Sequence, residues 1–244
     1  MQWCFKFLAL IIFILSPFAL AKPPEDFVYL SDIDPTILQE IRYATAHNFI
    51  GEPIRGYQKP ICMLTKKAAL QLKEVQSEIY KKGYSLKVYD CYRPRIATKQ
   101  MLDWSQNNNQ LMKLEFYPRV KKEKLLDGYI AAYSGHNRGS TVDLTIVKRD
   151  RLEQEQYQSG QPLMPCYVND RFKDNSIDMG TGFDCLDIAA HFNYSKISIQ
   201  AKRHRKILRQ LMKRYGFKPY QAEWWHFTLK NEPHKRTYFE FPIT

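Results

Sequence analysis

Three patterns are missing from this sequence of 244 residues, and each absence excludes a class of protein. No Cys-x-x-Cys pair occurs, which argues against a zinc cluster held by cysteines. No Gly-x-Gly-x-x-Gly motif occurs, so a dinucleotide-binding fold is not indicated. After residue 21, no apolar run is long enough to cross a membrane. What is present, 44% hydrophobic and 14% aromatic residues, suits one globular core of ordinary size.

The first 21 residues have the pattern of a secretory signal peptide. Lys6 is the only charged residue among them, an apolar run covers 7–15, and the small-x-small sequence Ala19-Leu20-Ala21 ends the segment. The apolar run is short for a membrane span, although an uncleaved N-terminal anchor is the alternative. We therefore predict a cleaved leader over 1–21, a single mature domain over 22–244, no stable membrane anchor, and a periplasmic or secreted location.

Export changes how the cysteines are interpreted. Four cysteines remain after residue 21, an even number in an oxidising compartment, where two disulfides are expected. The four allow three pairings, and free buried thiols are the alternative. We favour Cys62 with Cys91, which would join the two ends of a strand, helix and strand unit, and Cys166 with Cys185, which would close a loop.

The charge balance is strongly basic, at +12 for the full chain and +11 without Lys6. The basic residues are scattered and accompany no nucleic-acid-binding motif, so we predict no nucleic-acid partner. For an exported protein, attraction to an anionic cell-wall polymer is one interpretation of this charge. A plainly solvated basic surface is the other.

Apolar residues recur every three or four positions in 66–82 and 200–215, which predicts two amphipathic helices. Thr65 is a good N-cap for the first helix, and Gly83 and Gly216 are typical C-terminal stops. A further helix is predicted from Pro94 toward Trp104. The expected buried stripes are Ala68, Leu72, Val75 and Ile79 in the first helix, and Ile207, Leu208, Leu211, Met212 and Tyr215 in the last.

Strands are predicted at 84–92, from Thr141, and at 217–229, because apolar and polar residues alternate there. In the strand from Thr141, Asp143 projects away from the face that carries Val142 and Leu144. Helices and strands interleave without a regular βαβ repeat. The predicted fold class is therefore α+β, a single domain with a small, mainly antiparallel sheet flanked by helices.

Two short segments carry residues of the types that bind a catalytic metal ion. His136 lies in a Ser-Gly-His-Asn-Arg-Gly loop that leads to Asp143, and His226 ends the sequence Glu-Trp-Trp-His. Two imidazoles and a carboxylate supply three nitrogen and oxygen ligands, and a fourth position open to water distinguishes a catalytic zinc from a structural one. Zinc lowers the pKa of bound water to about 7, and Glu223 could serve as its base. The segments indicate a zinc hydrolase.

Glu223 and His226 place a demand on the backbone. Residues three apart point to opposite faces of a regular strand, and the aromatic run between them is poor helix material. We therefore predict a bend or bulge, with His226 on the strand and Glu223 in the turn before it. The alternative is two core tryptophans with a hydrogen-bonded Glu and His beside them. Residues 148–185, rich in turn formers and without a period, predict a long loop over the site.

The chain closely resembles the D-alanyl-D-alanine dipeptidases, zinc enzymes of peptidase family M15 typified by the vancomycin-resistance dipeptidase. The resemblance extends over nearly all of 22–244. Its motifs are Arg42-Tyr43-Ala44-Thr45 with Asn48-Phe49 and Gly56-Tyr57, Tyr92-Arg93-Pro94, Ser134-x-His136-x-x-Gly139 running to Asp143-Leu144-Thr145, Met179-Gly180 leading to Phe183-Asp184, Glu223-Trp224-Trp225-His226, and the tail Glu232-Pro233 with Tyr238 to Pro242.

The resemblance implies the fold of the zinc D,D-peptidases and hedgehog-like domains, and hydrolysis of D-alanyl-D-alanine to two D-alanines. Export would place this reaction in cell-wall salvage or turnover. The implied roles are His136, Asp143 and His226 as ligands of one Zn²⁺ per chain, Glu223 as general base and then acid, Arg93 on the oxyanion, Tyr43 and Asp184 on the substrate ammonium, and Ser134 near the substrate's far end.

One departure from the family pattern bears on specificity. The stretch between Asp143 and Asp184 is longer than in the typical enzyme and carries two cysteines, which leaves strict preference for a dipeptide open. A zinc D,D-carboxypeptidase or endopeptidase acting on peptidoglycan stem peptides is one alternative, and it should not need Asp184. A non-catalytic wall-binding module is another, against which Glu223 and Arg93 argue.

Overall fold

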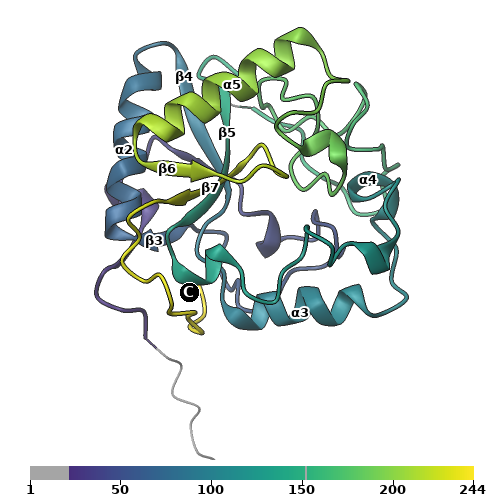
Figure 1. Ribbon diagram of the computed structural model, residues 1–244, viewed down its shortest axis with the longest axis horizontal. Coiled ribbons are helices and arrows are strands. Elements are labelled where there is room, and N and C mark those ends of the chain that lie inside the picture. The colour runs from purple at the N-terminus through teal and green to yellow at the C-terminus, as the bar shows by residue number, and fades with distance from the viewer. Residues whose placement is uncertain (1–21, 152) are drawn as a thin grey trace, which may run out of the picture.

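A five-stranded sheet runs through the centre of the molecule (Figure 1). The structure is a computed structural model and describes residues 22–151 and 153–244. Its strand order is β2-β4-β5-β7-β6, and only the β2/β4 pair is parallel. The chain is therefore α+β with a mainly antiparallel sheet, as predicted. The strands are β2 (Leu38–Gln39), β4 (Tyr84–Asp90), β5 (Thr141–Lys148), β6 (Phe217–Pro219) and β7 (His226–Leu229).

Three longer helices surround the sheet: α2 (Lys66–Tyr80), α3 (Arg95–Ser105) and α5 (Ile199–Arg214). α2 packs along β4 and α5 along β6, whereas α3 lies at the opposite edge of the molecule from α5 (Figure 1). The Thr65 side chain accepts the Ala68 N–H and so caps α2, as predicted, although the helix ends two residues early. The remaining elements are β1 (Phe27–Tyr29) paired with β3 (Met63–Thr65), α1 (Leu30–Ile33), α4 (Lys113–Phe116), and the 3₁₀ helices η1 (Arg42–Ala44), η2 (Lys122–Lys124), η3 (Gly135–Arg138) and η4 (Ile188–Ala190).

The predicted stripe of α2 is fully buried, but that of α5 is partly wrong. Ile207 is 51% exposed, and Arg205 takes a place on the buried face instead. The Arg205 guanidinium donates to the carbonyl oxygens of Met179, Ala189 and His191. This face of α5 packs against loop backbone with unpaired carbonyls, so a donor-rich side chain fits there better than an apolar one.

The predicted β segment over 217–229 is two antiparallel strands, β6 and β7, joined by a bend. The predicted strand over 84–92 ends at Asp90, where the register with β5 shifts. Both favoured disulfides are present, Cys62–Cys91 and Cys166–Cys185.

The predicted signal peptide falls on residues 1–21, outside the described residues. Within 22–151 and 153–244, no helix combines the length and apolar character needed to cross a bilayer.

Candidate active site

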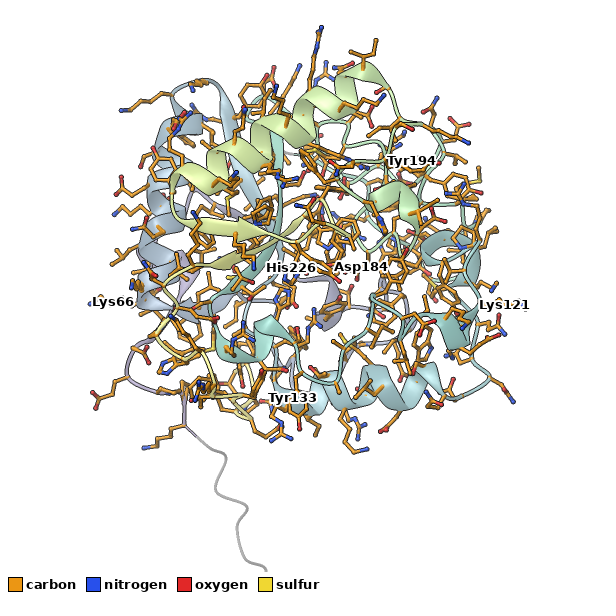
Figure 2. The ribbon with its side chains drawn as sticks, viewed as in Figure 1. Lys66, Lys121, Tyr133, Asp184, Tyr194 and His226 are labelled. Carbon is orange, nitrogen blue, oxygen red and sulfur yellow. A yellow bond between two sulfur atoms is a disulfide. The ribbon has the colours of Figure 1, made fainter. Side chains whose placement is uncertain are left out.

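The strand register brings three acid and imidazole side chains into one row. Asp143 on β5 is paired with Asp90 on β4 and with His226 on β7. Directly opposed residues on neighbouring strands project to the same face of the sheet. The Asp143 and His226 side chains line a pocket of about 280 Å³, and Asp90 is fully buried beside them. Figure 2 shows Asp184 and His226 close together near the middle of the molecule.

His136, Asp143 and His226 converge on one point in this pocket. Their nearest ligand atoms all lie within 4.8 Å of one another. His136 Nε2 is 3.2 Å from the Asp143 carboxylate and 3.3 Å from His226 Nδ1, and His226 Nδ1 is 3.1 Å from Asp143 Oδ1. The structure thus brings together the three predicted metal ligands, from a loop and two strands.

His136 is oriented by the backbone around it. It lies in η3, where the Ser134 hydroxyl accepts the His136 N–H and begins the turn. The His136 ring donates from Nδ1 to the Cys91 carbonyl oxygen at 2.7 Å, which leaves the Nε2 lone pair facing Asp143. Gly139 ends the turn with φ of 76°, and a β-carbon there would lie 2.2 Å from the Phe27 ring. Only glycine fits this close approach.

The donor set fits a zinc ion. Asp143 Oδ1 is buried, and although His226 Nδ1 lies 3.1 Å away, no described residue donates to it with hydrogen-bond geometry. A buried carboxylate oxygen left in this way costs free energy unless a cation satisfies it. Two imidazole nitrogens and one carboxylate oxygen are ligands that zinc prefers. Burial lowers the pKa of His226, which favours the neutral imidazole that a metal requires. Burial also lowers the pKa of His136, but the nearby Asp143 and Asp90 carboxylates outweigh it and raise that pKa.

Asp90 holds two site residues, a role that sequence reasoning did not assign. Its Oδ2 accepts from Arg93 Nε at 3.0 Å and Nη2 at 2.8 Å, and lies 3.3 Å from His136 Nδ1. Tyr57 donates to Oδ1 at 2.6 Å. The Arg93 guanidinium also lies over the Tyr43 ring, 4.9 Å from its centroid. In the sequence, Asp90 stands three residues before Arg93, and this spacing was the only hint of their contact. A single buried acid in a strand gives no distinctive pattern, so its role could not be assigned.

Asp184 and Tyr43 meet as predicted. The Tyr43 hydroxyl donates to Asp184 Oδ2 at 2.8 Å, and both side chains line the pocket. Asp184 has φ of 54°, a left-handed conformation that costs free energy in a non-glycine residue. Burial and then the Asp143 charge raise the pKa of Asp184 to about 7. A cationic group in the pocket would stabilise its ionised form.

Glu223 lies in the bend between β6 and β7, as predicted. His226 is the first residue of β7, its N–H donates to the Glu223 carbonyl oxygen, and Glu223 Oε2 is 3.4 Å from His226 Nδ1. Burial, followed by the charges of Asp143 and Asp184, raises the pKa of Glu223 well above its usual value. Glu223 and His226 therefore share one pocket because the strand breaks between them.

The prediction that residues 148–185 lie over the site is wrong for most of that segment. Its described residues after Lys148, where β5 ends, form no helix or strand, but only Asp184 of the segment lines the pocket. The facing wall comes from 128–136 and Tyr220, whose hydroxyl donates to the Gly128 carbonyl oxygen at 3.1 Å. Residues 128–133 have neither a period nor a motif, so no sequence signal pointed to them.

Comparisons with known proteins agree with this geometry. The family model described as D-ala-D-ala dipeptidase matches residues 24–157 and 151–244. Proteins named D-alanyl-D-alanine dipeptidase are 33% identical in Enterococcus faecalis and 34% identical in Streptomyces coelicolor, each over 220 residues, 89% of this chain and 98% of the relative. The one from Escherichia coli is 30% identical over 204 residues, 84% of each chain. The chain is thus a metallopeptidase and belongs to the D-Ala-D-Ala dipeptidase family, M15.

Proposed function

We propose that this protein is a zinc-dependent dipeptidase that hydrolyses free D-alanyl-D-alanine to two D-alanines. The names of its relatives support the substrate. The observation that carries the proposal is the presence of Asp184, bonded to Tyr43, in the same pocket as the candidate metal ligands. A buried carboxylate there can recognise the free ammonium group that distinguishes a dipeptide from the end of a longer chain.

The charges around the pocket support two cationic occupants. Three acids line it, namely Asp143, Asp184 and Glu223, and Asp90 lies directly behind it. Among the described residues that line the pocket, Arg93 is the one arginine. With all four acids ionised, three negative charges remain uncompensated. Buried charges that stay unpaired are strongly unfavourable. A zinc ion on His136, Asp143 and His226, together with a substrate ammonium at Asp184, would neutralise them.

The residues of this chain can divide the hydrolysis between them. Zinc bound at the three ligands would activate a water molecule and polarise the scissile carbonyl. The Glu223 carboxylate would take the proton from the attacking water and return it to the leaving amine nitrogen. Arg93 would stabilise the negative charge that develops on the carbonyl oxygen. Asp90 holds two of its nitrogens, and among the described residues Nη1 has only the Met101 sulfur at 3.6 Å as a partner.

The two ends of the substrate would be held at opposite sides of the reacting bond. Asp184 and Tyr43 would bind the ammonium group, and Ser134 would lie near the carboxyl end. The Ser134 hydroxyl already accepts the His136 N–H, but its own proton remains available to donate.

Export of the enzyme would place it in cell-wall salvage or turnover. The signal-peptide pattern of 1–21 supports a periplasmic or secreted location, and the two disulfides are compatible with one. Outside the cytoplasm the enzyme would meet the dipeptide only after its release from the wall. The basic charge is consistent with weak association with an anionic wall polymer.

Hydrolysis of free D-alanyl-D-alanine should be compared with hydrolysis of N-acetyl-D-alanyl-D-alanine, before and after chelation and zinc restoration. We expect cleavage of the free dipeptide, loss with the chelator, and recovery with zinc. Preference for the acylated peptide would instead indicate the D,D-carboxypeptidase or endopeptidase alternative. Zinc binding without hydrolysis of either peptide would indicate the wall-binding module.

A further inference from the structure

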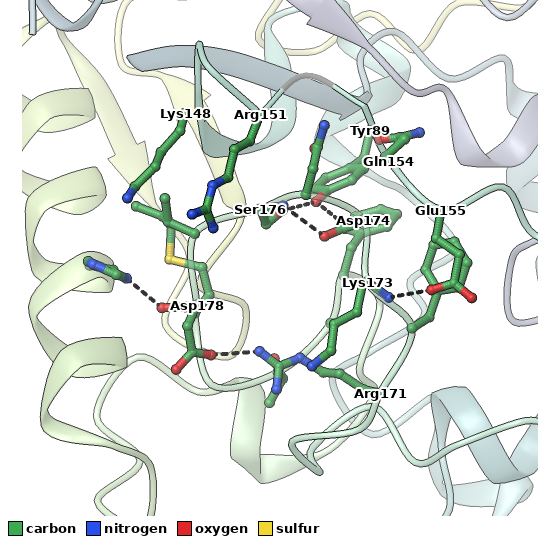
Figure 3. A pocket seen from close by; sticks show the side chains of 18 of the residues that line it. Tyr89, Lys148, Arg151, Gln154, Glu155, Arg171, Lys173, Asp174, Ser176 and Asp178 are labelled. Carbon is green, nitrogen blue, oxygen red and sulfur yellow. Dashed lines mark hydrogen bonds and ion pairs between the residues drawn. The ribbon is translucent and has the colours of Figure 1, made fainter. Parts of the chain in front are cut away.

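A second cavity, of about 540 Å³, lies behind the wall of the site pocket. We call it the loop cavity. Residues 171–183 form much of its lining, together with Lys148, Arg151, Gln200 and Trp224 (Figure 3). Its volume is in the range of about 300–1,000 Å³ that is usual for small-molecule sites. No role assigned to this protein so far uses it.

The loop cavity and the catalytic pocket share two wall segments. Phe183 lines the loop cavity while the next residue, Asp184, lines the catalytic pocket. In the same way, Trp224 lines the loop cavity while the preceding residue, Glu223, lines the catalytic pocket. The Trp224 indole N–H donates to the Thr181 hydroxyl at 2.8 Å, which joins the two segments. A molecule that packs on Phe183 and Trp224 therefore acts directly on the backbone that places Asp184 and Glu223.

Two acids of the loop cavity are already satisfied by protein groups. Asp174 accepts hydrogen bonds from the Tyr89 hydroxyl and the Ser176 N–H and is ion-paired with Lys87 and Arg42. The Lys87 and Arg42 side chains are buried, so their positive charges balance the Asp174 carboxylate within the protein.

Asp178 is satisfied in the same way at the other side of the loop. It pairs with Arg171 at 2.6 Å and accepts from the Gly180 N–H and the Ser198 hydroxyl. Neither Asp174 nor Asp178 therefore needs a cationic ligand.

Two cations of the loop cavity are not satisfied in this way. Both residues are exposed, and within 22–151 and 153–244 no acid or hydrogen-bond acceptor contacts the Lys148 ammonium or the Arg151 guanidinium, so both are free to bind a ligand. In the view of Figure 3 both lie on one side of the loop cavity, while Glu155 lies on the opposite side. Glu155 accepts from the Lys173 N–H at 3.4 Å. Lys148 and Arg151 thus offer positive charge in a cavity whose lining also includes Glu153 and three aromatic residues, Phe172, Phe183 and Trp224.

We propose that the loop cavity binds a small molecule that carries a carboxylate and an apolar or ring-shaped body. Lys148 and Arg151 bind the carboxylate, and the aromatic residues contact the body. Occupancy of the loop cavity stabilises the shared wall and so strengthens dipeptide binding at Asp184. The regulatory part rests on the proposed dipeptidase function, whereas the binding part does not.

Benzoate is a suitable probe, with benzamide as the neutral molecule of the same shape. Calorimetry on the zinc-loaded protein at constant ionic strength should detect benzoate, with benzamide at least about tenfold weaker, because charge-assisted hydrogen bonds are lost. The Lys148→Ala/Arg151→Ala variant should weaken benzoate binding by a similar factor. Lys73→Ala/Lys81→Ala removes the same charge from two exposed positions, one on α2 and one at its C-cap, and should change nothing. Equal benzoate binding by all three proteins would overturn the proposal.

Steady-state kinetics test the coupling. Benzoate should lower KM for the dipeptide and leave kcat unchanged, and by linkage the dipeptide should tighten benzoate binding by the same factor. Gln200→Trp fills the loop cavity from an exposed position and should abolish both effects while basal activity persists. Competitive inhibition by benzoate, equal in all variants, would place benzoate in the catalytic pocket and overturn the proposal. Charge-dependent benzoate binding in a protein that does not cleave the dipeptide would overturn only the dipeptidase function.

Discussion

The Cys91 carbonyl oxygen accepts a 2.7 Å hydrogen bond from His136 Nδ1, so one half of a disulfide orients a candidate metal ligand. The other disulfide ends at Cys185, directly after Asp184. The Cys62–Cys91 bridge is therefore one hydrogen bond away from the site, and the Cys166–Cys185 bridge is one residue away from it. Each anchors a different part of it, the candidate metal ligand His136 in one case and the proposed ammonium site at Asp184 in the other.

Removing the two disulfides separately should affect metal and substrate differently. Cys62→Ala/Cys91→Ala should lower zinc affinity by about 10- to 100-fold, the usual cost of disturbing the partner of a ligating histidine. Cys166→Ala/Cys185→Ala should raise KM for the dipeptide and leave zinc affinity unchanged. Metal-buffer titration and steady-state kinetics on both variants measure these effects. Identical losses in both would mean that the bridges only stabilise the fold.

Asp184→Asn should remove the recognition of the free amine. The amide keeps the size of the side chain and can still accept from Tyr43, but it lacks the charge that pairs with ammonium. We expect KM for the free dipeptide to rise by about 10- to 100-fold, since hydrogen bonds to charged groups are worth about 1.5–3 kcal/mol. Tyr43→Phe is the control and should have a smaller effect. An unchanged ratio between free and N-acetylated dipeptide would contradict this role.

Glu223→Ala should separate metal binding from turnover. The proposed zinc ligands His136, Asp143 and His226 remain, so metal content should stay near one ion per chain. Activity should fall by about 10²- to 10⁴-fold, the usual contribution of a general base. Metal analysis and kcat on the same preparation give both values. Unchanged activity would remove Glu223 from the mechanism.

Arg93→Lys should lower kcat although the positive charge is kept. Arg93 lines the pocket and binds Asp90 through two nitrogens while a third remains for the substrate, which a lysine ammonium cannot do. Loss of one oxyanion donor typically costs about 10²- to 10³-fold in rate. KM should change much less than kcat, because the interaction is made mainly in the transition state. A pure KM effect would place Arg93 in substrate binding.

The sequence predicted the site better than it predicted the walls around it. Motif residues such as His136 and Glu223 belong to short segments whose chemistry and spacing can be interpreted locally, and even the bend before His226 followed from strand alternation. Asp90 and Tyr220 could not be assigned, because their roles depend on contacts across strands and loops far apart in the chain. Arg205 was missed for a related reason: an apolar period cannot show that a helix faces unpaired carbonyls.

Asp184 also predicts how the stability of the metal-free protein depends on pH. Burial first, and then the Asp143 charge, raise the Asp184 pKa from 3.8 to about 7. Between these pH values the unfolded chain is ionised at this position while the folded protein holds a proton. Unfolding therefore releases a proton, and the free energy of unfolding falls as pH rises through this window, by up to about 1.4 kcal/mol per unit from this group.

Asp184→Asn removes that titration. Denaturant unfolding of the metal-free protein at pH 4 and pH 7 should therefore show a variant that gains stability relative to the unaltered chain as pH rises. Titrating groups that do not interact with Asp184 are common to both proteins and cancel in the difference. Zinc should reduce the difference, since a cation on Asp143 removes the repulsion that disfavours ionised Asp184. A difference between the two proteins that does not vary with pH would mean that Asp184 is already ionised in the folded, metal-free state.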